Sequence, residues 1–391
     1  MRILLVNKFY YPRGGDCMAM MRTEALLREQ GHEVAVFAMN HAQNLPHPSS
    51  SHFATEVQMN GNLAQRWRAV RRIMGHGDIR ASFTQALHDF KPDVVHLHNV
   101  HSYLSPIVAR LAHERGCRVV WTLHDYKLLC PRYTCMRDGA LCKLCFHGKA
   151  DVILHACMKN SVVASVLAWA EAKKWNRDQL CRWVDAFICP SQFMAQMMTE
   201  GGFLGDKLIV LNNFAEPAQL VAPSKRGDYY CYVGRISAEK GIKTLLQAAA
   251  QLPLRLKIAG GGPLLDELKE EFAHAGHIEF LGPLPQLDTQ ILLAQARCSV
   301  LPTECAENNP MSVIESLVAG TPVVATTMGG VPELIIPDNG LLCPPAQPDA
   351  LAAALREACS RTWNHAAIAA DARNRFAPAK HLSALMGIYR P

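Results

Sequence analysis

Two glutamates in the last third of the chain stand where each could bind a group rich in hydroxyls. Glu307 and Glu315 lie in the run ECAENNPMSVIE, with seven residues between them. The apolar run CSVLP precedes this segment, and Pro310 suits the start of a helix. Glu307 is therefore expected in a loop, within reach of a sugar hydroxyl. Glu315 is expected about two turns along the helix, where it can hold both hydroxyls of a ribose; the alternative is a partner of the helix cap.

Two cations follow an apolar strand-like run and form a candidate site for a diphosphate. The segment VGRISAEKG comes directly after YYCY, and it contains Gly234, Arg235 and Lys240. An arginine and a lysine beside the N-terminus of a helix can neutralise phosphate oxygens. The alternative is an ordinary pair of surface charges. The sequence therefore predicts an anion site after this strand.

Two glycine runs after other expected strands could let a ligand approach the backbone. PRGG, with Gly14 and Gly15, separates the first strand from the first helix, and IAGGGP, with Gly261, ends a strand before Pro263. Glycine permits a close approach of backbone to ligand, and helix amides can face an anion. A tight turn without a ligand would look the same, so both interpretations stay open.

A group of cysteines raises the question of a structural metal. Cys142 and Cys145 have the spacing of a zinc knuckle, and the nearby His147 and His155 are further possible ligands. Free thiols that shape an acceptor-binding loop are the alternative. The candidate zinc ligands are Cys130, Cys135, Cys142, Cys145 and Cys157.

The net charge of +6 is concentrated in the first part of the chain. Residues 1–215 hold 25 Lys and Arg against 17 Asp and Glu, whereas residues 216–391 hold 15 against 17. The densest basic stretch, RWRAVRRI, contains Arg66, Arg68, Arg71 and Arg72 beside Trp67 and Ile73. It suits an anionic membrane surface or an anionic acceptor, or else it is a solvated basic helix. No nucleic-acid-binding motif accompanies it, so nucleic acid is not an expected partner.

Strand-like and helix-like segments alternate through both halves of the chain. This βαβ rhythm predicts an α/β fold of two Rossmann-like, doubly wound domains that face each other across a cleft. The expected domains are residues 1–215 and 228–391, with a boundary near 213–227, and the last helix is free to pack back on the first domain. The chain shows neither a membrane span nor a signal peptide, so a cytoplasmic location, peripheral on the inner face of the cytoplasmic membrane, is expected.

Taken in order, these segments resemble the family 4 glycosyltransferases. The resemblance rests on GRISAEKG, KIAGGGP, ECAENNPMSVIESLVAGTPVVAT and GGVPELI, and on FYYPRGG, GHEVAVF, DVVHLHN and TLHDY. It spans nearly the whole chain and implies the GT-B fold. It also implies a retaining enzyme that moves a sugar from a nucleotide diphosphate sugar to a glycan or lipid-linked acceptor, in the synthesis of a surface or envelope glycan. No cofactor or catalytic metal is implied.

The resemblance assigns roles to individual residues. Arg235 and Lys240 would neutralise the donor diphosphate, Glu307 would contact the donor sugar, and Glu315 would bind the ribose. His124 of the TLHD segment would sit near the sugar, and Gly15 would approach the diphosphate. The catalytic set is thus His124, Glu307, Arg235 and Lys240, and the donor-binding set is Gly14, Gly15, Gly234, Arg235, Lys240, Gly261, Glu307 and Glu315.

Two other functions share this fold. A nucleotide-sugar epimerase also has two Rossmann-like domains, but the combination of GRISAEKG with the paired glutamates favours transfer. A non-catalytic protein that binds nucleotide sugars is the other alternative, and the intact set of charged residues argues against it.

Overall fold

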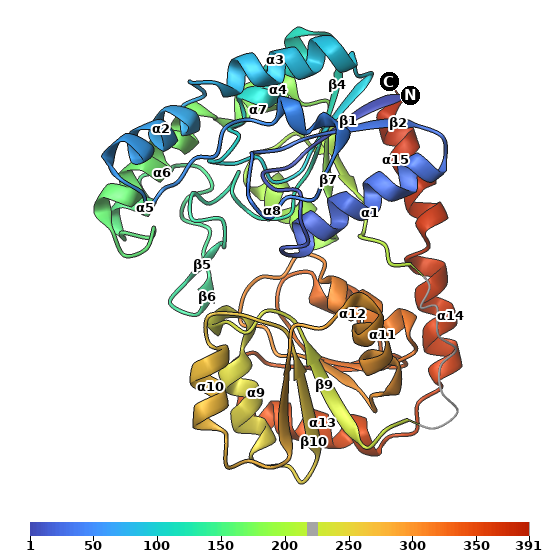
Figure 1. The fold of residues 1–391 in the computed structure, drawn as a ribbon. Coiled ribbons are helices and arrows are strands. Elements are labelled where there is room, and N and C mark those ends of the chain that lie inside the picture. Colours follow the sequence, from blue (N-terminus) through green and yellow to red (C-terminus); the bar gives the residue numbers. More distant parts are fainter. Residues whose placement is uncertain (217–225, 391) are drawn as a thin grey trace. The chain divides into compact units, whose positions relative to one another are not determined.

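A computed structural model describes residues 1–216 and 226–390, and it divides into two compact units. The first unit is Met1–Leu211 together with Leu382–Pro391, and the second is Asn212–His381 (Figure 1). Each unit is built around one six-stranded parallel sheet. The α/β fold class with two Rossmann-like domains is thereby confirmed.

The sheet of the first unit has the strand order β2-β1-β3-β4-β7-β8. Its strands are β1 (Arg2–Val6), β2 (Glu33–Phe37), β3 (Val94–Leu97), β4 (Arg118–Thr122), β7 (Ala186–Cys189) and β8 (Leu208–Val210). The helices of this unit are α1 (Gly15–Glu29), η1 (Pro48–His52), α2 (Leu63–Ile73), α3 (Ile79–Phe90), α4 (Ile107–Glu114), α5 (Asp151–Leu154), α6 (Val162–Lys174), α7 (Arg177–Trp183), α8 (Gln192–Glu200) and η2 (Gly205–Lys207).

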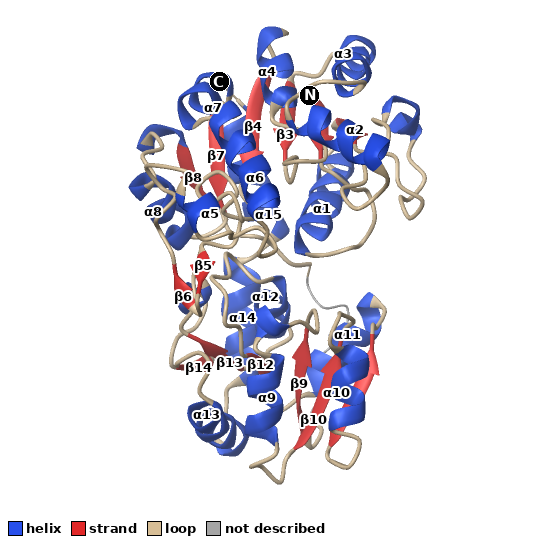
Figure 2. Cartoon of the chain, turned by 90° about the vertical axis from the view of Figure 1, so that its left-hand side faces the viewer, coloured by secondary structure: helices blue, strands red, loops and turns tan. Residues whose placement is uncertain are grey.

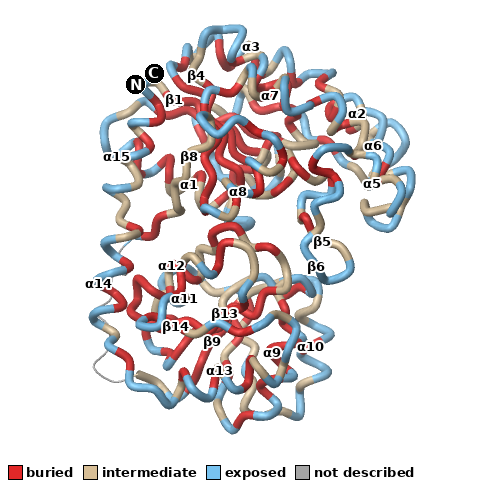
Figure 3. Tube along the Cα trace, turned by 180° about the vertical axis from the view of Figure 1, so that it is seen from behind, coloured by how far each residue is buried: buried red, intermediate tan, exposed pale blue. Residues whose placement is uncertain are grey.

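These strands form because their sequences are continuous apolar runs, as parallel strands covered on both faces require. Every residue of β3 and β7 is buried, as are the last four of β1 (Figure 3). Figure 2 shows the helices of this unit arranged around its strands. A separate small hairpin, β5 (Met136–Arg137) and β6 (Ala140–Leu141), lies between β4 and α5 along the chain.

The sheet of the second unit has the order β11-β10-β9-β12-β13-β14. Its strands are β9 (Tyr229–Val233), β10 (Arg255–Ala259), β11 (Ile278–Gly282), β12 (Ser299–Leu301), β13 (Val323–Thr326) and β14 (Gly340–Cys343). Its helices are η3 (Ala238–Lys240), α9 (Ile242–Ala249), α10 (Leu265–Glu271), α11 (Gln286–Gln295), α12 (Met311–Val318), η4 (Val331–Glu333), α13 (Pro348–Ser360) and α14 (His365–Arg375).

In each sheet, the chain first adds strands towards one edge and then towards the other. The place where this direction changes is called the reversal point. In the first unit this point lies between β1 and β3, and in the second unit it lies between β9 and β12. Ligands of open α/β sheets bind beyond the carboxyl ends of the strands at such points. The two topologies therefore select the loops after these four strands as places to look for a site.

The last helix, α15 (Pro378–Tyr389), begins in the second unit and ends in the first. From Leu382 onward it belongs to the first unit, where Leu385, Ile388 and Tyr389 join the buried apolar core. The boundary that the sequence predicted near 213–227 falls for the most part on residues 217–225, which lie outside the described residues.

Candidate functional site

In the second unit, the loops on either side of the reversal point are joined by an ion pair. The Lys240 ammonium, at the end of η3 after β9, pairs with the Glu307 carboxylate in the loop after β12. Burial alone would lower the pKa of Lys240, but the Glu307 charge and hydrogen bond, together with the neighbouring Cys305 and Glu239, raise the pKa overall. The structure thus brings together two residues that the sequence placed 67 positions apart.

The Glu307 loop is held by both its side chain and its backbone. The Thr303 hydroxyl donates to Glu307 Oε1 at 3.3 Å, and the Gly330 amide donates to the Glu307 carbonyl at 2.7 Å. Gly329 has a φ of +63°, and a Cβ there would lie 2.1 Å from the Glu307 carbonyl oxygen. This close approach requires glycine at 329, and it fixes the loop on which the carboxylate sits.

The glycine run after β10 is explained largely by the backbone of the unit itself. A Cβ on Gly260, whose φ is +143°, would lie 1.8 Å from the Gly234 carbonyl oxygen, and one on Gly262 would lie 2.2 Å from the Ile236 carbonyl oxygen. Gly261, the predicted donor-binding residue, meets only the Pro283 ring at 3.3 Å. The demand for glycine at 260 and 262 therefore comes from loop packing.

The helix that carries Glu315 starts one residue later than the sequence suggested. Pro310 is the N-cap of α12, which starts at Met311, so Glu315 lies at the beginning of the second turn rather than two turns along. This position is past the helix cap, and Glu315 there is partly buried.

The loop that carries Arg235 is tied down by its backbone and leaves the side chain exposed. The Tyr232 hydroxyl donates to the Arg235 carbonyl at 2.7 Å, while Tyr232 itself is fully buried in β9. A Cβ on Gly234 would come within 2.9 Å of that hydroxyl. Gly234 thus lets the tyrosine hold the loop, and the Arg235 guanidinium projects into solvent from a fixed base.

In the first unit, His124 follows β4 and contacts a second histidine from the neighbouring strand. His124 Nε2 lies 2.9 Å from Nδ1 of His98, which follows β3, and the two rings are stacked. Burial lowers the pKa of His124 to about 4, although the Asp16 charge opposes the shift. At neutral pH His124 is therefore an uncharged ring, able to donate or accept a proton in a hydrogen bond.

Asp16 forms a small charged network at the head of α1, beside the reversal point of the first sheet. Lys8 Nζ lies 3.5 Å from Asp16 Oδ2, and the Asn99 amide donates to the same oxygen at 3.1 Å. Burial would raise the pKa of Asp16, but the Lys8 charge and this hydrogen bond lower it overall. Gly14 and Gly15 precede it, are exposed, and would place a Cβ in open space or in ordinary contact.

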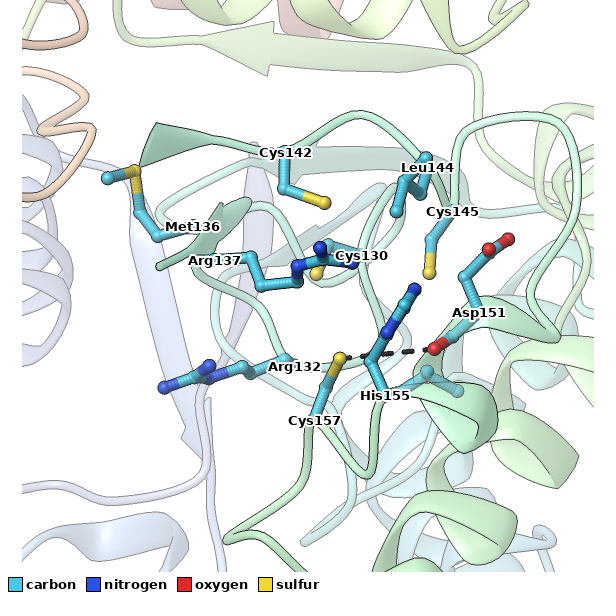
Figure 4. A pocket seen from close by; sticks show the side chains of 11 residues that line it. Cys130, Arg132, Met136, Arg137, Cys142, Leu144, Cys145, Asp151, His155 and Cys157 are labelled. Carbon is cyan, nitrogen blue, oxygen red and sulfur yellow. Dashed lines mark hydrogen bonds between the residues drawn. The ribbon is translucent and has the colours of Figure 1, made fainter. Parts of the chain in front are cut away.

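Four of the five candidate zinc ligands line one pocket in the first unit, namely Cys130, Cys142, Cys145 and Cys157 (Figure 4). Cys135 is not among the pocket residues; it is fully buried and hydrogen-bonded to Cys130. His155 lines the pocket, whereas His147 does not. Within residues 1–216 and 226–390, no three His, Cys, Asp or Glu side chains are arranged to hold a metal ion.

The basic stretch forms α2, but two of its residues face inward, contrary to the proposed surface anchor. Ile73 is buried, and Arg72 is almost fully buried, where it donates to the carbonyls of Tyr103 and Thr55 and pairs with Asp78. The sequence analysis counts Arg72 among the cations of the basic stretch, because a run of charges does not reveal which side chain is buried. The exposed cations of α2 are Arg66, Arg68 and Arg71.

The exposed face of α2 continues onto α5 and α6, which Figures 1 and 3 place at the same end of the first unit. The C-terminal ends of α2 and α6 meet where the Trp175 indole donates to the Ile73 carbonyl at 2.8 Å. Large apolar side chains lie exposed in the N-terminal halves of both helices and in α5. They are Leu63, Trp67, Leu154, Val162, Val163 and Val166.

Sequence reasoning missed several residues that the structure places at these edges. His98 and Asn99 end the run DVVHLHN, and their position after a strand was the only signal that could have found them. Lys8 and Asp16 lie on either side of the PRGG turn without any distinctive spacing. Their pairing depends on how β1 enters α1, which the sequence alone does not fix.

Two family models cover the chain. Residues 22–219 match the model described as Glycosyltransferase Family 4, and residues 216–375 match Glycosyl transferases group 1. An uncharacterized 42.6 kDa protein in the cps region of Klebsiella pneumoniae is 26% identical over 85% of this chain and 87% of its own length. Glycogen synthase of Mycobacterium tuberculosis is 27% identical over 91% and 85%.

Shorter and structural similarities agree with these matches. The O-antigen chain mannosyltransferase B of Escherichia coli is 32% identical over 32% of this chain and 35% of its own. The crystal structure of Anabaena HepE in complex with UDP and glucose superimposes with a TM-score of 0.67 at 19% identity, over 99% of this chain and 98% of that one. Sucrose-phosphate synthase from Thermosynechococcus elongatus gives a TM-score of 0.69 at 16% identity, over 99% and 98%. Among the described residues, no helix is long and apolar enough to cross a membrane.

Proposed function

Because this chain belongs to glycosyltransferase family 4, we propose that it transfers a sugar, with retention of anomeric configuration, from a nucleotide diphosphate sugar to a glycan or lipid-linked acceptor in surface polysaccharide synthesis. Relatives named for an O-antigen chain and for the cps region support this setting. A neighbouring structure that contains UDP and glucose supports the donor class.

The observation that carries the proposal is the ion pair between Lys240 and Glu307 at the reversal point of the second sheet. An ammonium there is a natural partner for a diphosphate, and a carboxylate there can accept hydrogen bonds from sugar hydroxyls. In the absence of donor each neutralises the other. When the donor binds, Lys240 turns to the diphosphate and Glu307 to the sugar, so the pair is a preformed site for both ends of the bond that breaks.

The chemistry follows from the charge that develops in the reaction. Cleavage of the anomeric bond leaves negative charge on the departing diphosphate, which fixed cations stabilise. Lys240 and Arg235 take this role in the proposal, and Glu315 holds the ribose. His124 stays uncharged at neutral pH, so it can hydrogen-bond to the sugar or acceptor without repelling a cationic transition state.

The test is a turnover assay with UDP-sugars and GDP-sugars, with and without a lipid-linked saccharide acceptor. Release of nucleotide diphosphate that depends on acceptor, with a product of the same anomeric configuration as the donor by NMR, supports the proposal. An inverted product would refute retention. An epimerised donor, or tight donor binding without turnover, would refute transfer itself.

For the acceptor side, we propose that the first unit binds an anionic membrane surface with α2, α5 and α6. Exposed cations lie on α2, exposed apolar side chains lie on all three helices, and α2 has no acidic residue. Arginine and lysine attract anionic lipids, while tryptophan and aliphatic side chains enter the headgroup region. This surface matches the lipid-linked class of acceptor.

A further inference from the structure

We infer that the first unit holds a structural zinc ion on four cysteine thiolates, those of Cys130, Cys142, Cys145 and Cys157. None of these four residues belongs to the proposed donor site. The role of the zinc ion is to hold the long irregular segment between β4 and α6. The inference does not depend on the proposed transfer reaction.

The pocket selects these four cysteines from the five in the segment. They line it together (Figure 4), whereas Cys135, although hydrogen-bonded to Cys130, is fully buried and does not line the pocket. With Cys135 set aside, the spacing becomes regular: eleven residues separate Cys130 from Cys142, two separate Cys142 from Cys145, and eleven separate Cys145 from Cys157. The central pair has the spacing of a zinc knuckle, and Cys130 and Cys157 supply one further thiol on either side of it.

The segment has little regular secondary structure to fix its backbone. Residues 123–161 contain only a four-residue helix and a hairpin of two-residue strands. Six of the ten non-glycine residues with positive φ in the described chain lie between 133 and 160, namely Tyr133, Cys135, Asp138, Ala156, Lys159 and Asn160. Such conformations persist only where surrounding structure enforces them, and long irregular segments in compact domains need a reason to be ordered. A bound metal ion supplies one.

A buried lysine already draws two of the ligand-bearing turns together. Lys149 Nζ donates to the Leu129 carbonyl at 2.6 Å and to the Cys145 carbonyl at 2.7 Å. Leu129 directly precedes Cys130, so one ammonium binds the backbone next to the Cys130 thiol and next to the Cys145 thiol. Hydrogen bonds that orient the ligand-bearing backbone are the outer shell that zinc sites require.

The charges around the pocket suit a tetrathiolate ion. When Zn²⁺ binds, the four thiols release four protons, and the product carries a net charge of −2. Arg132 and Arg137 line the same pocket, and the Lys149 ammonium donates to the Cys145 carbonyl. In the structure the four sulfurs line one pocket without converging, so binding of the ion requires them to move inward.

The decisive measurement is the zinc content of tag-free protein purified without chelator, together with its absorption spectrum after exchange to Co²⁺. We expect about one zinc per chain, and a Co²⁺ spectrum with intense thiolate charge-transfer bands and the visible bands of a tetrahedral site. C142S/C145S should lose nearly all bound metal. The matched control C117S/C181S changes two cysteines of the same unit outside the pocket and should keep it.

Three results would overturn the inference. Wild-type protein with only traces of zinc, even after growth with added zinc, would exclude a resident ion. Metal that survives in C142S/C145S would place it elsewhere. Disulfides among the four cysteines, found by mass spectrometry of alkylated protein, would show that the segment is held by oxidation instead. If C142S/C145S does not fold, the zinc content and Co²⁺ spectrum of the wild type still decide.

Discussion

The two units are each built on a six-stranded parallel sheet with one reversal point, but they differ in strand order and in the loops beyond their strands. In the second unit these loops are short, and close backbone approaches at Gly260 and Gly329 fix them. In the first unit the loop after β4 opens into the irregular segment 123–161, and the nearby charges, such as Asp16, come from scattered positions. Under the proposed function, the fixed loops of the second unit would present the same groups to the nucleotide sugar, and the irregular segment of the first unit would lie on the acceptor side.

The largest expected effect comes from removing a cation of the second unit. Lys240→Ala and Arg235→Ala should each lower kcat by about 10²–10³-fold, because each removes stabilisation of the leaving diphosphate. Lys243→Ala is the matched control, since Lys243 is an exposed lysine of the same unit that pairs with Glu267. If both variants are folded by circular dichroism and turn over at the wild-type rate, the assignment of the diphosphate site is refuted.

The two glutamates are expected to affect different kinetic constants, one the KM for donor and the other kcat. Glu315→Ala should mainly raise the KM for donor, by roughly ten- to a hundredfold, because a ribose contact acts alike in ground and transition states. Glu307→Ala should chiefly lower kcat, since it touches the reacting sugar. Steady-state kinetics at several donor concentrations checks both variants. The opposite pattern would mean that the two roles are exchanged.

If the first unit binds membranes through α2, changes in this helix should weaken binding to anionic vesicles and leave donor binding unchanged. Changing Arg66, Arg68 and Arg71 to Gln should weaken binding to anionic vesicles on the order of a hundredfold, since each basic residue near such a surface contributes about 1 kcal/mol. Sedimentation with the vesicles at increasing salt measures this binding.

The control for the vesicle experiment changes three exposed arginines of the second unit, Arg356, Arg361 and Arg373, to Gln. It removes the same charge from the other unit. If both triple variants lose binding equally, net charge and not the α2 face attracts the membrane. If neither loses it, the basic helix is an ordinary solvated surface.

The smallest effect concerns pH and His124. Its pKa of about 4 lies below the ordinary value of 6.5, so between these values the unfolded chain binds a proton that the folded chain does not. The free energy of unfolding therefore falls as pH drops from 6.5 towards 4, and His124→Asn should make this fall shallower. Urea unfolding across that range measures it, with the exposed His76→Asn as control. An unchanged slope in His124→Asn would show that the ring is not buried.

What the sequence predicted well is what local pattern determines. Continuous apolar runs indicated the strands, and strand ends placed Lys240 and Glu307 each in a loop after a strand. Nothing in the sequence showed that these two loops are neighbours or that the residues pair. Arg72 shows the limit, because its burial depends on Asp78 and on two distant carbonyls. The approach of Lys8 to Asp16 likewise depends on tertiary geometry, which spacing along the chain does not encode.

The course of α15 has a consequence for how the protein folds as it is made. Residues 1–211 leave the ribosome first, but their core lacks Leu385, Ile388 and Tyr389, which arrive about 170 residues later. At roughly 5–20 residues per second, this delay amounts to about 10–30 seconds. During that time apolar surface on β1, β3 and β4 stays uncovered, and the second unit can complete its own core first. The segment synthesised first is therefore the last to be finished, and its nascent form is a natural client for chaperones.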